Sequence, residues 1–357
     1  MMEFKKIELE QEKEWETIRE DFADGDVYYM NGYVKGLSVH GDGAPILVYY
    51  EENGLRLMNV LMKRDLSEFG PLRSLCPPGT WYDATTPYGY GGMLAEGKDA
   101  PAEQWKRAAA AYRRFCVKEH IVSEFVRFYP LAENAAYGNW FWITKKRGPT
   151  VVLPLRSEEE IWNQMKSTHR NRIRRAEKKG ITIKWGTGER ELREFQEIYR
   201  ETMDRDRADS YYYFKPAVYE TWFQELKGHI TLFWAELEGK TIASSIMLMG
   251  KGRLHYHLGG TRTEYLSDSP NNLLFYEAAC YGFRNGYREM HLGGGLGSRE
   301  DSLYLFKKKF CRNGKDPVFF TGTQIYDQER YRTLETARGF RSVPSYFPSY
   351  RGMEELE

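Results

Sequence analysis

Side chains that could act as a base or a cation gather in one stretch of the sequence, residues 254–310. His257 follows Tyr256 near the end of a strand-like run, and His291 lies in a second such run before a glycine cluster. Lys307 begins a run of three lysines. A lone histidine in a strand is most often packed or at the surface, and a lysine run is most often solvated. These residues alone therefore leave both a catalytic and a structural interpretation open.

Carboxylates and cysteines add little to this chemistry. Glu277 lies in a helix-like run of the same stretch and Asp209 lies before it, and both are weaker candidates for a base. No Ser-His-Asp or Cys-His arrangement can be argued. The four cysteines are scattered and form no CxxC pair, which argues against a disulfide framework and against a structural zinc site. We expect reduced, structural thiols and no metal centre.

The overall charge gives the protein no general attraction for a polyanion. The chain of 357 residues has 52 basic and 51 acidic residues, a net charge of +1, so a nucleic acid or an anionic membrane would have to be bound by a local patch. No run approaches the roughly 20 apolar residues of a membrane-spanning helix, and the charged N-terminus has no signal-like core. We expect a cytoplasmic protein. Its 26 tyrosines could line a cleft for a sugar, peptide or base, or lie at core edges.

The elements that would position these residues occur twice. In the first half, periodicity and turn residues predict helices at 8–22, 27–37 and 101–119, a strand hairpin at 46–50 and 55–62, and a strand at 121–129. In the second half, they predict a helix at 214–226, strands at 230–237, 241–249 and 253–259, a helix at 271–285 and a strand at 289–292. This order indicates two copies of one unit, although helix-hairpin-helix-strand is also a common order.

The length of the chain allows each copy to bury its own core. We expect the first domain at residues 1–150, which the segment 326–357 could complete, and the second domain at 151–325. Each would have helices packed on a mixed, mainly antiparallel sheet, which is an α+β fold.

A basic helical segment, residues 157–180, lies between the two halves. Its apolar positions form one face, which is typical of an amphipathic helix. Such a helix is usually a solvated face, but this density of charge could also meet the phosphates of a nucleotide-linked substrate or of an RNA. The cations are Lys166, Arg170, Arg172, Arg174, Arg175, Lys178 and Lys179.

Four motifs, taken in this order along the chain, resemble one protein family. They are Phe125-Val126-Arg127-Phe128-Tyr129-Pro130, the run from Thr168-His169-Arg170-Asn171 to Lys179-Gly180, Ser269-Pro270-Asn271-Asn272-Leu273-Leu274, and Leu305-Phe306-Lys307. With the predicted element order, the chain is similar to a tandem of two Gcn5-related N-acetyltransferase (GNAT) units, the arrangement of the Fem-type aminoacyltransferases that build peptidoglycan cross-bridges. The resemblance implies an acyltransferase of cell-wall synthesis.

The resemblance assigns roles to residues of the second unit. Lys307, which follows Phe306, would supply the cation that acyl transfer needs near a developing oxyanion. Tyr256 would face the cleft and His257 would not, because neighbouring strand residues point to opposite faces. Asn271 would contact substrate from the start of its helix.

The same resemblance assigns an acceptor site before the second hairpin. Arg207 and Tyr211 would hold the phosphates of a nucleotide-linked acceptor, since the arginine fork matches phosphate geometry. The alternative for Arg207 is a surface ion pair with Asp204 or Asp206.

The sequence departs from the GNAT pattern at the loop that normally cradles the pyrophosphate of coenzyme A. Residues 261–270 contain no glycine and two acids, which shifts the expected donor from acetyl-CoA to aminoacyl-tRNA. The corresponding loop of the first half contains Tyr88 and Tyr90 between glycines and is better suited to a sugar or peptide. The coiled-coil arm of some Fem-type members is absent, which leaves tRNA recognition to the basic segment 166–179.

Three functions therefore remain in order of preference. The first is transfer of an aminoacyl group from aminoacyl-tRNA to an amine of a nucleotide- or lipid-linked muropeptide or sugar, with no tightly bound cofactor. The second is an N-acyltransferase of an amino sugar that uses acetyl-CoA or another acyl-CoA. The third is a relative without catalysis that binds a glycan or peptide.

Overall fold

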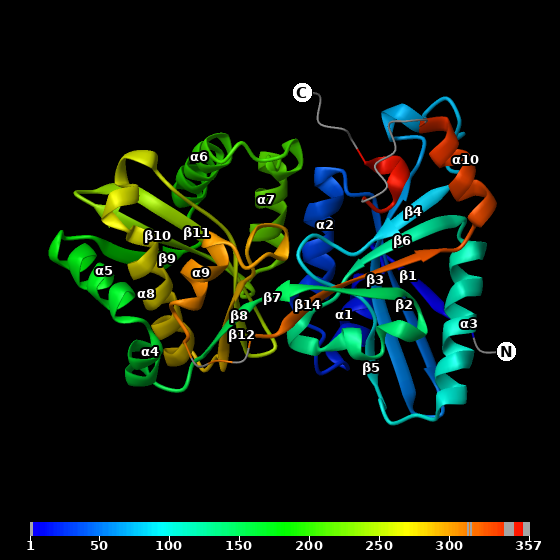
Figure 1. Cartoon of the computed structure of the whole chain (residues 1–357), viewed down its shortest axis with the longest axis horizontal. Coiled ribbons are helices and arrows are strands. Elements are labelled where there is room, and N and C mark those ends of the chain that lie inside the picture. Colours follow the sequence, from blue (N-terminus) through cyan, green and yellow to red (C-terminus); the bar gives the residue numbers. More distant parts are fainter. Residues whose placement is uncertain (1–2, 313, 315, 339–345, 353–357) are drawn as a thin grey trace. The chain divides into compact units, whose positions relative to one another are not determined.

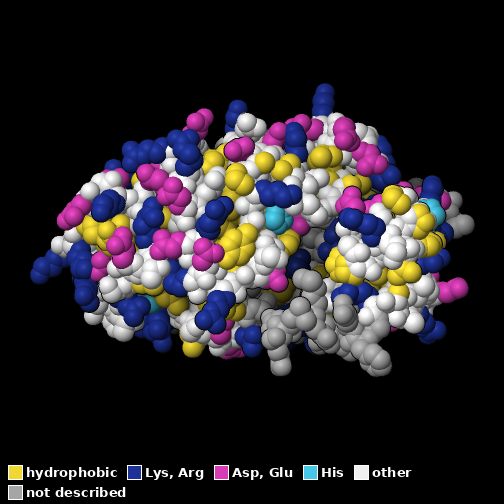
Figure 2. All heavy atoms as spheres, turned by 90° about the horizontal axis from the view of Figure 1, so that it is seen from above, with side chains coloured by type: hydrophobic (Ala, Val, Ile, Leu, Met, Phe, Trp, Pro, Cys, Tyr) yellow, Lys and Arg dark blue, Asp and Glu magenta, His cyan; other side chains and the backbone are white. Residues whose placement is uncertain are grey.

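The chain forms two compact units in a computed structural model that describes residues 3–312, 314, 316–338 and 346–352 (Figure 1). Unit 1 comprises Met1–Arg147 and Phe319–Glu357, and unit 2 comprises Gly148–Val318. No helix within the described ranges is long and apolar enough to cross a membrane. Figure 2 shows basic and acidic side chains interspersed over one face of the molecule, as expected for a net charge near zero.

Unit 1 is built on an eight-stranded mixed sheet. The strand order is β1-β2-β3-β4-β6-β14-β7, and β5 pairs with β3. The strands are β1 (Lys5–Glu8), β2 (Ala44–Glu52), β3 (Leu55–Asp65), β4 (Tyr82–Thr85), β5 (Leu94–Glu96), β6 (Ile121–Arg127), β7 (Ile143–Pro149) and β14 (Val318–Ile325). The helices are α1 (Glu12–Glu20), α2 (Asn31–His40), α3 (Ala102–Lys118) and α10 (Gln328–Arg338). The late strand β14 thus lies inside the sheet, between β6 and β7.

Unit 2 is built on a six-stranded sheet with the order β8-β13-β12-β11-β10-β9. The strands are β8 (Val151–Pro154), β9 (Thr182–Gly186), β10 (Ile230–Leu237), β11 (Lys240–Gly250), β12 (Arg253–Thr261) and β13 (Glu289–Gly293). The helices are α4 (Glu158–Gln164), α5 (Ser167–Lys178), α6 (Glu189–Arg205), α7 (Pro216–Glu225), α8 (Pro270–Arg284) and α9 (Ser302–Lys308).

The two units repeat one order of elements, which confirms the predicted tandem α+β fold. In each, one strand, two helices, three successive strands, one helix and one further strand follow each other; these are β1, α1, α2, β2, β3, β4, α3 and β6 in unit 1 and β9, α6, α7, β10, β11, β12, α8 and β13 in unit 2. In both, the third strand of the meander pairs in parallel with the strand after the long helix, as β4 with β6 and β12 with β13.

Tight turns explain why the two hairpins form where the sequence predicts them. Asn53 and Gly54 join β2 to β3 with φ of 45° and 85°, and Glu238 and Gly239 join β10 to β11 with φ of 51° and 77°. Two successive residues of positive φ make the turn whose twist suits a two-residue hairpin.

Several helices and strands differ from the predictions. The helix predicted at 8–22 is shorter, because β1 precedes it and pairs with β2. The helix predicted at 27–37 is α2, preceded by a short 3-10 helix, and the basic segment is broken into α4 and α5 where Met165 is extended. Strands β4 and β5 and helix α6 were not predicted. Helix α6 nevertheless carries the signal, since Leu192, Phe195, Ile198, Tyr199 and Thr202 are buried at helical spacing.

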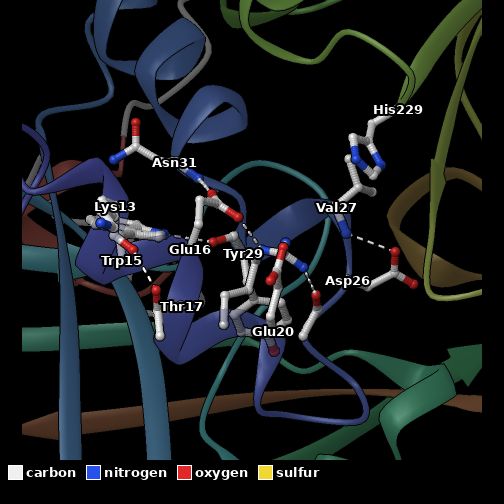
Figure 3. A network of polar contacts seen from close by, with 12 residues as sticks. Lys13, Trp15, Glu16, Thr17, Glu20, Asp26, Val27, Tyr29, Asn31 and His229 are labelled. Carbon is white, nitrogen blue, oxygen red and sulfur yellow. Dashed lines mark hydrogen bonds and ion pairs between the residues drawn. The ribbon is translucent and has the colours of Figure 1, made fainter.

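Side-chain hydrogen bonds hold α1 to the segment that follows it (Figure 3). The Trp15 indole N–H donates to the carbonyl oxygen of Tyr29 at 2.8 Å, and the Glu16 carboxylate accepts from the backbone N–H of Asn31 at 2.7 Å. Asp26 accepts from the backbone N–H of Val27. These contacts explain why the chain turns between α1 and α2 and does not continue one long helix.

A buried carboxylate links α3 to the strands of unit 1. Glu124 on β6 is 1% exposed and accepts hydrogen bonds from the Tyr112 hydroxyl at 3.0 Å, the Trp142 indole at 2.8 Å and the Tyr326 hydroxyl at 2.6 Å. Burial raises the pKa of Glu124, and these hydrogen bonds oppose the rise. The carboxylate joins segments that are more than 200 residues apart in sequence.

Removing this carboxylate should destabilise unit 1. We expect Glu124→Ala to lower the free energy of unfolding by about 3 kcal/mol or more, because it leaves several buried donors without an acceptor. Urea denaturation followed by circular dichroism measures the change. The control Glu103→Ala removes an exposed carboxylate paired with Lys106 and should change stability by less than about 0.5 kcal/mol. A loss below about 1 kcal/mol for Glu124→Ala would contradict the role of Glu124 as a buried acceptor.

Candidate active site

A capped turn places Lys307 at the end of the short helix α9. The Asp301 side chain accepts hydrogen bonds from the backbone N–H of Tyr304 at 2.9 Å and of Leu296 at 2.8 Å, so it begins the helix and holds the preceding turn against it. Gly297 has a φ of 58°, which favours glycine in that turn. Tyr304 and Lys307 are three residues apart and both face inward.

The ammonium group of Lys307 is buried without a carboxylate partner. The residue is 6% exposed, its Nζ donates to the carbonyl oxygen of Gly294 at 2.8 Å, and no carboxylate of the described ranges lies within ion-pair distance. Burial lowers the pKa of Lys307 to about 8, and the charge of Asp301 partly offsets this effect. The site therefore holds a poorly solvated cation that can accept further hydrogen-bond acceptors.

Helix α5 supports α9 through His169, a residue that the sequence analysis did not select. His169 is fully buried, and its Nε2 lies 3.1 Å from the carbonyl oxygen of Phe306. Burial lowers the pKa of His169 to about 4, so its ring is neutral at pH 7 and Nε2–H donates to that carbonyl. The His169 ring also packs against the rings of Phe306 and Phe310. Phe306 is thus a packing residue that fixes the orientation of the following lysine.

Strand β12 brings Tyr256 to Lys307. The Lys307 Nζ lies 5.6 Å from the centre of the Tyr256 ring, and that ring packs on Phe275 of α8 at 4.7 Å. Burial raises the pKa of Tyr256 to about 12, so its hydroxyl is protonated at pH 7 and can donate. The aromatic face stabilises the lysine cation at this distance.

His257 faces away from Tyr256. It is the extra residue of a β-bulge, because Leu258 pairs with Ile246 while Tyr256 pairs with Met247. Its ring packs on Trp222 of α7, and burial lowers its pKa to about 3. A group that is neutral over this range is a weak acid, and nothing places it beside Lys307.

The parallel pairing of β12 with β13 ends at His255 and His291, whose rings lie 5.8 Å apart. Strand β12 continues to Thr261, so the two strands are unpaired beyond this point. His291 therefore lies at the end of the parallel pair and packs against another histidine. Its position is that of a strand residue in the sheet, and Lys307 has no printed contact with it.

The loop before α8 is a poor cradle for an anion. Residues Thr263–Asp268 form a 3-10 helix, Ser269 has a φ of 56°, and Pro270 gives the first turn of α8 no N–H. Asp268 forms an ion pair with Lys179 at the end of α5. A carboxylate thus lies beside the helix N-terminus, where it opposes the binding of a pyrophosphate.

The buried residue in the first turn of α8 is Asn272, the neighbour of the predicted Asn271. Asn271 is half-buried, whereas Asn272 is 1% exposed and its Nδ2 has no hydrogen-bond partner within the described ranges. Asn272 lies one turn before Phe275 on the same face of α8, and Phe275 contacts Tyr256. A buried amide donor without a partner is rare in native structures, which marks Asn272 as a further candidate for binding substrate.

The residues predicted to bind phosphate lie on the segment after α6. Arg207 is exposed with a φ of 48° and, within the described ranges, forms no ion pair with the two acids considered as alternatives. Asp206 is instead paired with Arg205, and Asp204 accepts from the Tyr213 hydroxyl. Arg207 is available to a ligand, as the first interpretation requires.

Tyr211 and Asp209 belong to the 3-10 helix that follows. Asp209 accepts a hydrogen bond from the backbone N–H of Tyr211 at 2.8 Å and so caps this helix. The Tyr211 ring contacts Tyr212 and Phe214. Asp209 is therefore a cap, and Glu277 on α8 is a half-buried carboxyl group whose pKa is raised by burial.

Tyr88 and Tyr90 belong to unit 1, whereas Lys307 and Tyr256 belong to unit 2. The Tyr90 ring packs on Tyr28 at 5.4 Å, and the carbonyl oxygen of Tyr88 accepts from the Tyr33 hydroxyl. Gly89 has a φ of 89°, and a Cβ there would lie 2.8 Å from the Tyr28 ring. Within unit 1 these tyrosines form a packed aromatic cluster.

The basic helix α5 divides its cations between packing and solvent. Arg170 donates to the carbonyl oxygen of Met165, Arg174 lies over the Trp162 ring, and Lys179 pairs with Asp268. Four others are exposed and form no ion pair within the described ranges; they are Lys166, Arg172, Arg175 and Lys178.

Comparisons with known proteins agree with this fold. Residues 163–301, within unit 2, match the family model described as acetyltransferase (GNAT) domain. No curated protein matches the chain. Among solved structures, FemX has a TM-score of 0.65 at 13% identity, covering 92% of this chain and 99% of that chain.

Two further solved structures share the architecture at low identity. A tandem GNAT protein from the clavulanic acid biosynthesis pathway has a TM-score of 0.53 at 10% identity, covering 91% of this chain and 99% of that chain. The C-terminal domain of a putative lysylphosphatidylglycerol synthetase from Agrobacterium fabrum has a TM-score of 0.51 at 14% identity, covering 88% and 91%. The predicted resemblance to Fem-type tandem GNAT proteins is confirmed as a likeness of fold, and it supports an acyltransferase.

The buried ammonium group predicts a variant that is more stable than the wild type. Because the folded pKa of Lys307 is about 8 and the unfolded value is about 10.4, the unfolded chain binds more protons between these values, and wild-type stability rises with pH across that window. We expect Lys307→Met to gain about 2 kcal/mol below pH 8, after allowance for the lost hydrogen bond to Gly294. The gain should fade towards about pH 10.5.

Urea denaturation at pH 7 and at high pH measures this difference. The control Lys106→Met replaces an exposed lysine of unit 1 and should show no gain that depends on pH. A Lys307→Met protein that is less stable than the wild type at pH 7 would contradict the cost of burying this charge.

Proposed function

We propose that the protein is an acyltransferase that moves an aminoacyl group from aminoacyl-tRNA to an amine of a cell-envelope precursor, as in peptidoglycan cross-bridge synthesis. The observation that carries this proposal is the buried ammonium of Lys307, which has no carboxylate partner in the described ranges and lies beside the protonated hydroxyl of Tyr256. The likeness of fold to FemX supports the same class of reaction.

The proposed step is attack of the acceptor amine on the ester carbonyl of the donor. A tetrahedral intermediate forms, and its oxyanion needs a cation or hydrogen-bond donors in a place with little water. Lys307 supplies the cation, and Tyr256 and Asn272 can supply neutral donors. The ester C–O bond then breaks, the ribose oxygen leaves with a proton that the amine gives up, and an amide remains. No covalent enzyme intermediate is needed, since the donor is already an activated ester.

The loop before α8 supports tRNA as the donor over coenzyme A. A GNAT enzyme that uses coenzyme A binds the pyrophosphate with backbone N–H groups at this helix N-terminus. Here that position has Pro270, Asp268 and no glycine. The match of residues 163–301 to an acetyltransferase domain favours the second candidate, an acyl-CoA-dependent N-acyltransferase, and direct assay separates the two.

The exposed cations of α5 are the proposed contact for tRNA. Arg175 and Lys178 lie one turn apart, are exposed and form no ion pair within the described ranges. Exposed cations without acidic partners are suited to phosphates, which release their counterions on binding. Arg207, equally without an acidic partner, is the proposed contact for a phosphate of the acceptor.

Transfer of label from charged tRNA or from acetyl-CoA to a mixture of envelope precursors tests the reaction. We expect transfer from charged tRNA, and a loss of about 100-fold to 1,000-fold in Lys307→Ala, the range for removal of an oxyanion donor. The protonated ammonium is the active form, so wild-type transfer should fall as pH rises through about 8.

The matched control is Lys308→Ala, because the neighbouring lysine pairs with Asp316 at 2.6 Å and does not reach Tyr256. It should transfer at the wild-type rate. Label from acetyl-CoA alone would establish the second candidate in place of the first, and no transfer from either donor would contradict both.

Removal of two cations of α5 tests the tRNA contact. We expect Arg175→Gln with Lys178→Gln to weaken tRNA binding and to reduce the slope of log affinity against log salt by about 1.5, because two phosphate contacts are lost. Filter binding over a range of salt measures both. The control Arg190→Gln with Arg193→Gln removes the same charge from the exposed face of α6, where both arginines pair with glutamates. Equal effects in the two double variants would contradict a specific contact on α5.

A further inference from the structure

Three exposed leucines surround the element that carries Lys307. Leu296 is 69% exposed, Leu303 is 36% exposed and Leu305 is 52% exposed. Leu296 lies in the turn before α9, and the other two lie on α9 itself. At 100° per residue, Tyr304 and Lys307 point to the core, while Leu303 and Leu305 leave the helix on its outer side.

The leucines form one structural piece with the catalytic candidate. The Asp301 carboxylate accepts from the backbone N–H of Leu296 and from that of Tyr304, so the turn and the helix cannot move apart without losing the cap. A scattered surface leucine needs no explanation, but three within ten residues at a candidate active site do.

Cations lie around this apolar surface. The backbone N–H of Lys166 donates to the carbonyl oxygen of Lys309, which joins the start of α5 to the end of α9. The charges of Arg172 and Lys309 both contribute to the lowered pKa of His169, whose ring contacts Phe306. Arg299 likewise contributes to the lowered pKa of Asp301. Lys166, Arg172, Arg299 and Lys309 have no acidic partner in the described ranges.

We propose that the outer side of α9 and the turn before it, with Leu296, Leu303 and Leu305, dock on an anionic lipid surface. Leucines that enter the boundary of head groups and acyl chains, with lysines and arginines at their border, have the composition that binds such a surface. Phosphates of RNA would use the cations but leave the leucines in water. A neutral partner protein would use the leucines but not the cations.

This docking deepens the proposed function, on which its second part rests. A lipid surface at α9 would present a lipid-linked acceptor, and not a freely soluble one, to Lys307. The leucines are not part of the reaction chemistry, so docking and transfer can be measured separately.

Sedimentation with vesicles tests the proposal on the whole protein. Vesicles of phosphatidylcholine with phosphatidylglycerol should bind the wild type, and vesicles of phosphatidylcholine alone should bind it more weakly. The triple variant Leu296→Ser, Leu303→Ser and Leu305→Ser should lower the partition coefficient by about tenfold or more, since one fully buried leucine accounts for roughly that factor. Arg299→Gln with Lys309→Gln should lower it about fivefold or more on the anionic vesicles only.

The control changes equally exposed apolar residues of unit 1: Leu75→Ser, Val117→Ser and Ile143→Ser, with exposures of 43%, 53% and 74%. It should bind vesicles as the wild type does. Vesicle binding that the leucine variant retains, or binding equal on both kinds of vesicle, would overturn the proposal. Self-association or tRNA binding lost in the leucine variant, with no vesicle binding by the wild type, would overturn it in favour of a second copy or an RNA.

A water-soluble amine acceptor separates this inference from the proposed function. We expect the leucine variant to transfer the aminoacyl group to such an acceptor at the wild-type rate and to lose transfer to an acceptor carried in vesicles. Vesicle binding without any transfer would contradict the proposed function alone. Transfer that is equal from solution and from vesicles in the leucine variant would overturn the docking inference alone.

Discussion

The burial of one ammonium group places demands on every element around it. Lys307 is held in a place where its charge is poorly solvated, and a chain that gained nothing from this would replace the lysine with an apolar residue. Its neighbours therefore have to fix it in place. Asp301 begins the helix, His169 holds the backbone of the preceding residue, and β12 supplies an aromatic ring beside Nζ. The same arrangement that costs stability gives a cation that is oriented before a substrate arrives.

The two units have used the same meeting of parallel strands in different ways. In unit 2 the pair β12 and β13 parts beyond His255, next to the residues proposed for chemistry. In unit 1 Asp83 lies on the corresponding strand β4, is fully buried and pairs with Arg64 at 2.7 Å and with Arg351. Both arginines hold the pKa of Asp83 below its usual range despite its burial. Unit 1 thus uses this place for an ion-pair network that fastens the end of the chain.

Sequence patterns predicted the fold better than they predicted the site. Asn53-Gly54 fixes a hairpin through local sterics, and α3 follows from its alanine-rich periodicity, so both can be found in a short window. Strand β4 has four residues after a loop rich in proline and glycine, which gives too little pattern to detect. The bond between His169 and Phe306 joins residues 137 apart, and no local rule predicts it. Asp301 could have been found, since an aspartate three residues before Tyr304 fits a helix cap.

The place of β14 has a consequence for the order in which the protein can form during synthesis. This strand lies between β6 and β7 of unit 1, yet residues 318–325 leave the ribosome only after the whole of unit 2 has been made. Until then β6 lacks one neighbour, and the Glu124 carboxylate lacks the hydroxyl of Tyr326. Unit 2 is continuous in sequence and has all of its strands earlier. The N-terminal half of the nascent chain must therefore wait, with an open sheet edge, for the C-terminal half to fold first.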